Sequence, residues 1–188
     1  MKKFLKPYLA FLMMGSLIAT TACSDDDNPD PVDDGEVITT LNLEMVPEGK
    51  GQMVTAFFKD LDGPGGNAPT QTALLTLEPN TTYNVDLTLL NESGTTPVDI
   101  TTEVRAESDE HQVFYVASSN LGWNVTINDQ DSKGRPLGLD ATIVTGATGT
   151  GTLRVVLKHQ PGTKAAAPGD ITKGETDIDV TFNVAVQE

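Results

Sequence analysis

Apolar and polar residues alternate with a period of two over much of the chain from Val37 onward, and this pattern is the strongest constraint on the fold. A period of two puts apolar side chains on one face of a β-strand, whereas an amphipathic helix repeats about every 3.6 residues. The clearest alternating segments are residues 37–45, 83–89, 98–105 and 177–186. We predict a strand at each, with one face buried and the other hydrated, as in antiparallel sheets.

Clusters of Gly, Pro, Asn and Asp separate these segments from further candidate strands, and such residues favour turns. The further candidates are residues 52–59, 72–78, 111–117, 123–128, 138–145 and 151–159. About ten short strands at this spacing predict an all-β domain, an antiparallel β-sandwich that is immunoglobulin-like in outline. A closed β-barrel is the alternative architecture.

The N-terminus has the three parts of a bacterial secretion signal. A basic start, MKKFLK, precedes the apolar residues 8–19, which are fewer than the about 20 that span a bilayer. Small residues then lead to Cys23, the single cysteine of the chain, at the position where a lipoprotein signal is cleaved and acylated. We therefore predict lipidation of Cys23, with palmitate among its acyl chains. An ordinary signal with an incidental cysteine is the alternative.

Residues 24–35 read SDDDNPDPVDDG and offer almost nothing apolar to pack, which predicts a disordered, self-repelling tether. The acidic residues directly after the cysteine resemble the export signal of Bacteroidetes-type surface lipoproteins, and a solvated linker is the alternative. The expected organisation is a signal peptide at 1–22, acylated Cys23 with its tether at 23–35, and a β-sandwich at 36–188. The expected location is the outer membrane, lipid-anchored at the cell surface.

The net charge of −15 narrows the classes of partner. Nucleic-acid binding depends on clustered Lys and Arg that displace counterions, and anionic lipid surfaces also attract basic segments. So acidic a chain argues against both kinds of partner. Solubility explains the charge most simply, and a cation-binding surface is the alternative.

Three segments resemble a known family. They are DEHQ at 109–112 with Phe114-Tyr115 after it, DLDGPGGNAP at 60–69, and LKHQPG at 157–162. They are similar to Bacteroidetes-type outer-membrane lipoproteins that are often catalogued as "type 1 periplasmic binding fold superfamily" proteins and encoded beside TonB-dependent receptors. The resemblance spans about residues 36–187. It implies an outer-membrane location, a TonB-dependent receptor as partner, and capture of a nutrient or metal, and it supplies no catalytic residues. Type 1 periplasmic binding folds are two-lobed α/β domains, so we retain the all-β prediction that the alternation supports.

The chain has two histidines, His111 and His159, each followed by Gln. His159 shares the core-facing parity of its strand, and His111 opens another strand beside Asp109 and Glu110. If the two strand ends are neighbours, imidazoles and carboxylates converge in a ligand set that suits Zn²⁺, Fe²⁺ or Cu²⁺. We expect His111→Ala and His159→Ala each to abolish metal binding, and side chains more than about 8 Å apart to exclude a shared ion. The alternative is that each His caps its own strand end by a hydrogen bond.

Two loops have the Asp-x-Asp pattern of calcium sites. Asp60 and Asp62 in DLDG are weak candidate calcium ligands, because Pro64 follows closely and no Glu stands at the twelfth position. In the loop at 129–134, Lys133 occupies the place of an oxygen ligand. Asp and Gly are also common turn residues, so we interpret both loops mainly as turns.

The sequence offers no signature of an enzyme. It has no G-x-S-x-G elbow, no H-E-x-x-H and no phosphate-binding loop, and the single cysteine is assigned to the anchor. We therefore expect a non-enzymatic binding module, accessory to a TonB-dependent receptor, with a transition metal ion as its possible cofactor. A structural or adhesive surface lipoprotein without a small ligand is the alternative. A metal-assisted hydrolase ranks third, because it needs an open coordination position.

Overall fold

The structure is a computed structural model that describes residues 36–188. The predicted signal peptide, Cys23 and the tether lie outside the described residues. The described part contains eleven strands, one α-helix and one short 3-10 helix. Their bounds are β1 Thr40–Pro47, β2 Val54–Lys59, β3 Thr70–Gln71, β4 Leu75–Leu77, β5 Thr82–Asn91, β6 Val98–Asp99, α1 Ile100–Ala106, β7 His111–Ala117, η1 Ser119–Leu121, β8 Asn124–Ile127, β9 Asp140–Val144, β10 Gly149–His159 and β11 Glu175–Val186. None of the helices in this range is long and apolar enough to cross a membrane.

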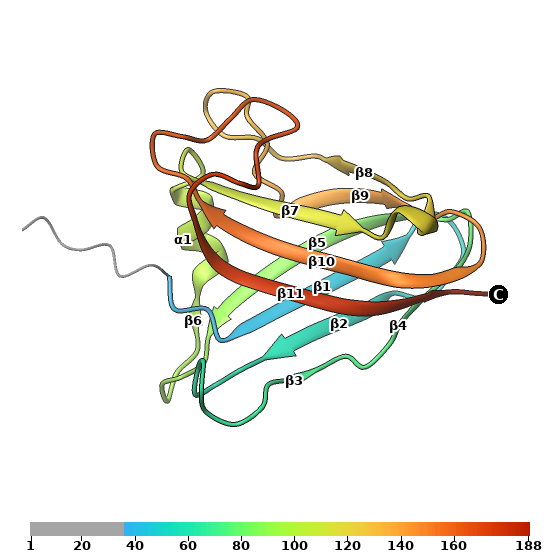
Figure 1. Ribbon diagram of the computed structural model, residues 1–188, viewed down its shortest axis with the longest axis horizontal. Helices are drawn as coiled ribbons and strands as arrows, with labels where there is room; N and C mark the ends of the chain where they lie inside the picture. The colour runs from blue at the N-terminus through green and yellow to red at the C-terminus, as the bar shows by residue number, and fades with distance from the viewer. Residues whose placement is uncertain (1–35) are drawn as a thin grey trace, which may run out of the picture. The chain divides into compact units, whose positions relative to one another are not determined.

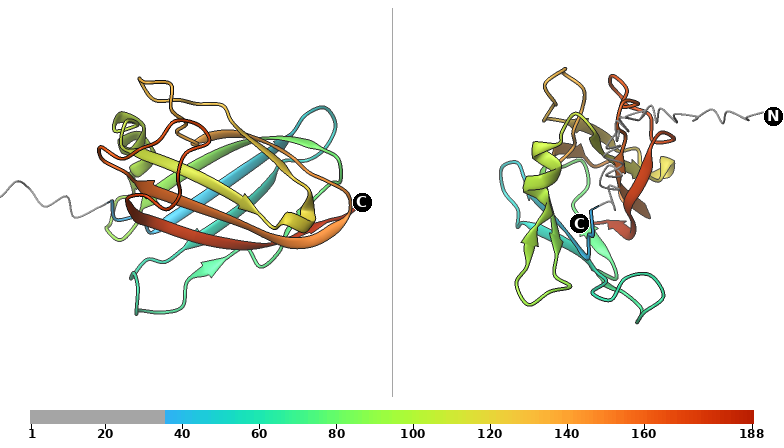
Figure 2. Two further views of the ribbon diagram at one scale, coloured as in Figure 1. Left: turned by 45° about the horizontal axis from the view of Figure 1, so that its top comes forward. Right: turned by 90° about the vertical axis from the view of Figure 1, so that its left-hand side faces the viewer.

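The strands form two sheets that pack face to face, which confirms the predicted all-β sandwich (Figure 1). One sheet has the order β3-β2-β1-β5-β9-β8, with β6 added to β5, and the other has the order β4-β11-β10-β7. Strands β7, β10 and β11 lie in front of β1, β5 and β9 in Figure 1, and Figure 2 shows the two layers from other sides. Neighbouring strands are antiparallel except for β4, which runs parallel to β11.

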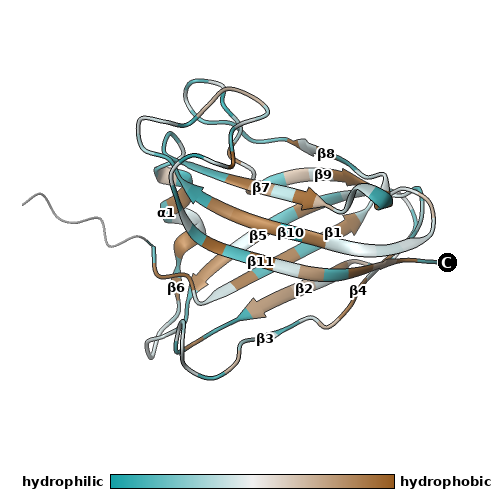
Figure 3. Ribbon diagram, in the orientation of Figure 1, coloured by the Kyte–Doolittle hydropathy of each residue, from teal (hydrophilic) through white to brown (hydrophobic). Residues whose placement is uncertain are grey.

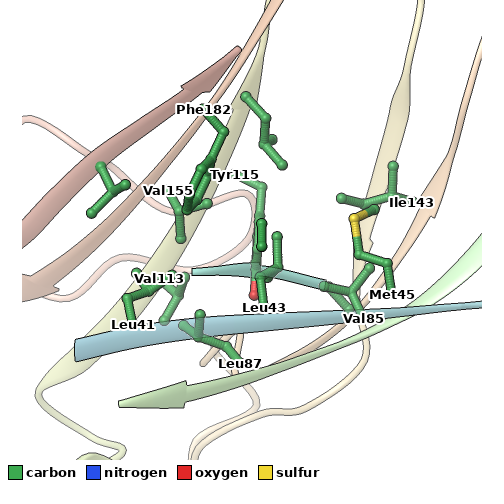
Figure 4. Packing of buried hydrophobic residues seen from close by; sticks show 14 of the residues in the cluster. Leu41, Leu43, Met45, Val85, Leu87, Val113, Tyr115, Ile143, Val155 and Phe182 are labelled. Carbon is green, nitrogen blue, oxygen red and sulfur yellow. The ribbon is translucent and has the colours of Figure 1, made fainter. Parts of the chain in front are cut away.

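The core lies between the sheets and contains the apolar members of the alternating pattern. Leu43 of β1 pairs with Leu87 of β5, and both side chains belong to the same buried cluster as Val155 and Phe182 of the opposite sheet (Figure 4). The alternation is visible along the strands as successive apolar and polar bands (Figure 3). Truncating one such leucine to Ala would cost about 2–5 kcal/mol.

The predicted strand at 98–105 is wrong beyond its first two residues, because α1 begins at Ile100. Asp99 caps the helix by accepting a hydrogen bond from the backbone N–H of Thr102 at 3.4 Å. Ile100 and Val104, the buried residues of α1, are four positions apart and therefore lie on one helix face as well as one strand face. In a strand every i,i+4 pair also shares one face, so the alternation fits both conformations, and the cap at Asp99 favours the helix.

Four segments meet at one end of the sandwich (Figure 1). The chain enters β1 there through Glu36, β7 and β11 begin there, and β10 ends there. His159, the last residue of β10, pairs with His111 of β7 on one side and with Glu175 of β11 on the other. This end of the sandwich therefore brings titratable residues from distant parts of the chain together.

Candidate metal centre

Three side chains with metal-ligating atoms converge at this end of the sandwich: Glu36, His111 and Asp177. The Nε2 atom of His111 lies 2.7 Å from Oε1 of Glu36 and 4.0 Å from Oδ2 of Asp177. One ligand atom from each residue lies within 4.8 Å of the others. We call these three residues the acid–histidine cluster.

The acid–histidine cluster is buried, and several of its polar atoms form no hydrogen bond. The exposed fractions of the Glu36, His111 and Asp177 side chains are 7%, 0% and 5%. Within the described residues, Oε2 of Glu36 and Oδ2 of Asp177 have no hydrogen-bond partner, and the nearest acceptor to Nε2 of His111 is Oε1 of Glu36, with which it forms an ion pair at 2.7 Å when the ring is protonated. Each buried polar atom without a partner costs about 1–3 kcal/mol, so a bound cation would offset a substantial penalty.

The other ring nitrogen of His111 is held by the helix that the sequence did not predict. Nδ1 lies 3.2 Å from the backbone carbonyl of Glu107, the C-cap residue of α1. A bound metal ion requires the tautomer with its proton on Nδ1, in which this nitrogen donates to the carbonyl and Nε2 offers its lone pair to the ion. Such a hydrogen bond from the remote ring nitrogen is the usual arrangement of a metal-binding histidine.

The electrostatics of the cluster follow from burial and mutual contact. Burial and the nearby Glu36 carboxylate raise the pKa of Asp177 to about 6, against the attraction of His111. Burial alone would lower the pKa of His111 and raise that of Glu36, but contact between the two outweighs it and raises the His111 pKa while lowering the Glu36 pKa. The cluster thus retains protons near neutral pH that a divalent cation would displace.

Asp177 joins the cluster because β11 contains a β-bulge. Leu157 of β10 pairs with Ile178, and Lys158 pairs with Thr176, so Asp177 has no partner in the ladder. By simple alternation Asp177 falls on the polar face with Asp179, which is 39% exposed. The extra residue turns Asp177 toward the buried His111 instead, and re-aiming a side chain is a known consequence of bulges.

The structure brings together most of the residues that the sequence suggested. The His111 and His159 rings have centroids 4.7 Å apart, inside the 8 Å limit, but the rings stack with planes only 13° from parallel. Glu110 Oε2 lies 3.4 Å from Nε2 of His159. Nitrogen atoms on two parallel rings do not point toward one ion. We therefore assign His111 to the cluster, and His159 packs its ring against the face of the His111 ring.

Asp109 is the predicted ligand that the structure places elsewhere. Its carboxylate accepts a hydrogen bond from the hydroxyl of Ser132 at 2.9 Å and pairs with Lys133 at 2.9 Å. The Asp109 carboxylate therefore binds residues of the loop at 129–134, while the carboxylate of Glu110, the next residue, contacts His159. In place of Asp109, Glu36 and Asp177 provide the carboxylates near His111, and no motif in the sequence marked either residue.

Asp60 and Asp62 do not form a calcium loop of their own. The Asp62 carboxylate accepts hydrogen bonds from the backbone N–H and side-chain amide of Asn67, at 2.9 and 2.6 Å. Oδ1 of Asp60 is buried and has no partner. Both residues line a cavity of about 470 Å³ that Glu36 and Asp177 also line. The weak candidate calcium residues thus adjoin the acid–histidine cluster.

In the loop at 129–134, the positive charges beside Asp131 come from the side chains of Arg135 and Lys164. The buried Asp131 carboxylate contacts Nε of Arg135 at 2.7 Å and Nζ of Lys164 at 3.1 Å. Two backbone N–H groups, of Lys133 and Arg135, donate to its other oxygen. These partners satisfy Asp131 and agree with the interpretation of this loop as a structural turn.

Comparison of the chain with protein-family models, with curated proteins and with solved structures gives no match.

Proposed function

We propose that this protein is an exported lipoprotein whose β-sandwich binds one divalent transition-metal ion at Glu36, His111 and Asp177. The observation that carries the proposal is that Glu36, His111 and Asp177 bring one ligand atom each within 4.8 Å of one another, in a buried place where a carboxylate oxygen of Glu36 and one of Asp177 form no hydrogen bond. Buried polar groups are nearly always satisfied in folded proteins, and exceptions indicate a functional role or an ion.

The ligand chemistry favours Zn²⁺ or Fe²⁺. One imidazole nitrogen and two carboxylates form a mixed set that suits borderline metals better than soft Cu(I). Two ionised carboxylates with a neutral imidazole also balance the charge of a divalent ion. Three protein ligands leave at least one position open in tetrahedral zinc coordination, as in sites that exchange their ion or accept a further ligand.

The cellular part of the proposal rests on the sequence. The signal with Cys23, the acidic residues after it and the resemblance to outer-membrane lipoproteins support a lipid-anchored position at the cell surface. A metal-binding domain there would deliver its ion to a neighbouring TonB-dependent receptor, without catalysing a reaction. The alternative remains a structural or adhesive surface protein, which would bind no ion.

Calorimetric titration with zinc tests the metal site. The protein is the full chain with Cys23→Ser, purified in mild detergent, so that neither an acyl chain nor a thiol interferes. We expect one zinc ion per chain, and loss of at least tenfold in affinity for each of Glu36→Gln, His111→Ala and Asp177→Asn. Asp86→Asn, which removes an exposed charge from the outer face of β5, serves as the control and should not change the affinity. Absence of zinc uptake, or uptake that all three variants retain, contradicts the proposal.

Two measurements on the native protein test the location and the partner. Intact-mass analysis should give a chain that begins at Cys23 and carries acyl groups, and an unmodified start elsewhere would contradict the anchor. Affinity purification after crosslinking of intact cells should recover a TonB-dependent receptor. Recovery of the protein without any such receptor would favour the structural or adhesive alternative.

A further inference from the structure

We infer that the cavity beside the acid–histidine cluster holds a small organic cation, which coordinates the bound metal through a nitrogen atom and places its positive charge beside Asp60. This inference rests on the proposed metal site and names the kind of ligand that completes it. Glu36 and Asp177 line the cavity, whereas the fully buried His111 is not among the described lining residues. An ion held by all three residues would therefore have its open coordination position on the cavity side.

The cavity has the size of a small-molecule site. Its volume of about 470 Å³ falls within the range of about 300–1,000 Å³ that is typical of ligand pockets. Apolar side chains, among them Ile38, Phe58 and Ile178, form part of its wall. They provide contact for the hydrocarbon part of a ligand that reaches the metal at one end.

The charge of the wall selects the class of ligand. The carboxylates that line the cavity belong to Glu36, Asp60, Asp62, Asp177 and Asp179, and its lining within residues 36–188 contains no Lys or Arg. A divalent ion would neutralise Glu36 and Asp177. Arg154 neutralises Asp179 through contacts of 2.6 and 2.8 Å. Anionic chelators would meet the remaining negative charge and are disfavoured.

Among the described lining carboxylates, Asp60 and Asp62 have no ion pair, and only Asp60 has a buried oxygen without a hydrogen bond as well. The oxygens of Asp62 are oriented by Asn67, whereas Oδ1 of Asp60 is buried without any hydrogen-bond partner. An ammonium group would provide the missing donor and the positive charge together. The ligand that fits is thus an amine or imidazole with a second, protonated nitrogen that reaches Asp60 across the shared cavity.

Histamine is a suitable probe, because its imidazole coordinates zinc and its ammonium group extends beyond the ring. We would titrate histamine, and imidazole as the comparison, into the zinc-saturated Cys23→Ser chain. Histamine should bind at least tenfold more tightly than imidazole. Asp60→Asn should remove most of this difference while leaving imidazole binding unchanged, and the exposed control Asp86→Asn should preserve it.

The outcomes separate this inference from the proposed function. If zinc does not bind, the metal site itself fails. If zinc binds but histamine and imidazole bind equally, or histamine only strips the zinc into solution, the metal site stands and the inference about the cavity is overturned. If Asp60→Asn does not fold, Asp60→Ser replaces it, and a preference for histamine that this variant leaves at full strength also overturns the inference.

Discussion

The imidazole rings of His111 and His159 stack with their centroids 4.7 Å apart and their planes 13° from parallel. The two residues are direct partners in the ladder between β7 and β10, so the strand register fixes this arrangement. Nδ1 of His111 is oriented by the carbonyl of Glu107, and its Nε2 contacts Glu36 and Asp177. His159 supports the ring face and contacts Glu110.

This arrangement gives the two histidines different roles. A phenyl ring can replace the stacking surface of His159 but offers no nitrogen, so we expect His159→Phe to keep zinc affinity within about threefold, since it conserves volume and shape. His111→Phe should abolish binding. Zinc calorimetry on both variants checks this expectation. Loss of binding in His159→Phe would mean that His159 itself ligates the ion and that the rings rearrange.

Asp177 should destabilise the metal-free protein at neutral pH. Burial and Glu36 raise its pKa from 3.8 to about 6 in the folded state. The folded state therefore holds this proton more tightly than the unfolded state, and the resulting stability is lost as the pH rises from about 4 to about 6. Since one pKa unit corresponds to about 1.4 kcal/mol, ionised Asp177 costs up to about 3 kcal/mol above that window.

We accordingly expect Asp177→Asn to raise the free energy of unfolding by about 1–3 kcal/mol at pH 8 with a chelator present, because it removes a buried charge. At pH 3.5 the gain should disappear. Urea denaturation at both pH values measures it. The matched control is Asp179→Asn, two residues along β11, which breaks an exposed ion pair with Arg154 and should cost at most about 1 kcal/mol. Destabilisation by Asp177→Asn at pH 8 would indicate a structural carboxylate.

Zinc affinity should fall in mild acid. Contact with Glu36 raises the pKa of His111 above 6.5 despite burial, and the pKa of Asp177 is about 6. Both groups must lose their protons to bind a cation, so protons compete with zinc below about pH 7. We expect at least a tenfold loss of affinity from pH 7.5 to pH 5.5, with proton release detectable by calorimetry in buffers of different ionisation enthalpy. A flat profile would place the ion on other groups.

The buried Asp131–Lys164 pair should be essential for stability and irrelevant to zinc. Both side chains have no exposed surface, and Lys164 Nζ also donates to the carbonyl of Ser108 at 2.6 Å. Asp131→Ala leaves Lys164 buried without its counter-charge, which should cost about 3–5 kcal/mol in urea denaturation. Lys133→Met, at a side chain that is 63% exposed, is the control and should change stability by less than about 1 kcal/mol. If Asp131→Ala left the free energy of unfolding unchanged, water would have to reach the Asp131–Lys164 pair.

The same pair sets an acid limit to folding. Burial would raise the pKa of Asp131, but hydrogen bonds from the backbone of Arg135 and Lys133 and from the Lys164 ammonium hold it far below 3.8. Its contribution is therefore fully present above about pH 4 and is lost as the pH falls toward the folded pKa.

Alternation identified most strands because the side-chain period of a strand is local. The predicted strand at 111–117 has the bounds of β7, and the alternating terminal segment became β11. Alternation failed at 98–105, where a helix cap at Asp99 changed the conformation of a segment whose apolar residues fit either period. A local sequence pattern predicts which face of the sheet a residue occupies only where the strand register is regular.

The sequence by itself predicted an all-β domain, with a sandwich favoured over a barrel, and it placed His111, His159 and Glu110 at strand ends whose proximity the structure then established. Only the tertiary structure decided which carboxylates surround His111. Glu36 arrives there because the chain enters the sandwich at that end, and Asp177 because a bulge reverses its direction. Strand pairing and bulges depend on contacts between segments far apart in the chain, whereas alternation depends on adjacent residues alone.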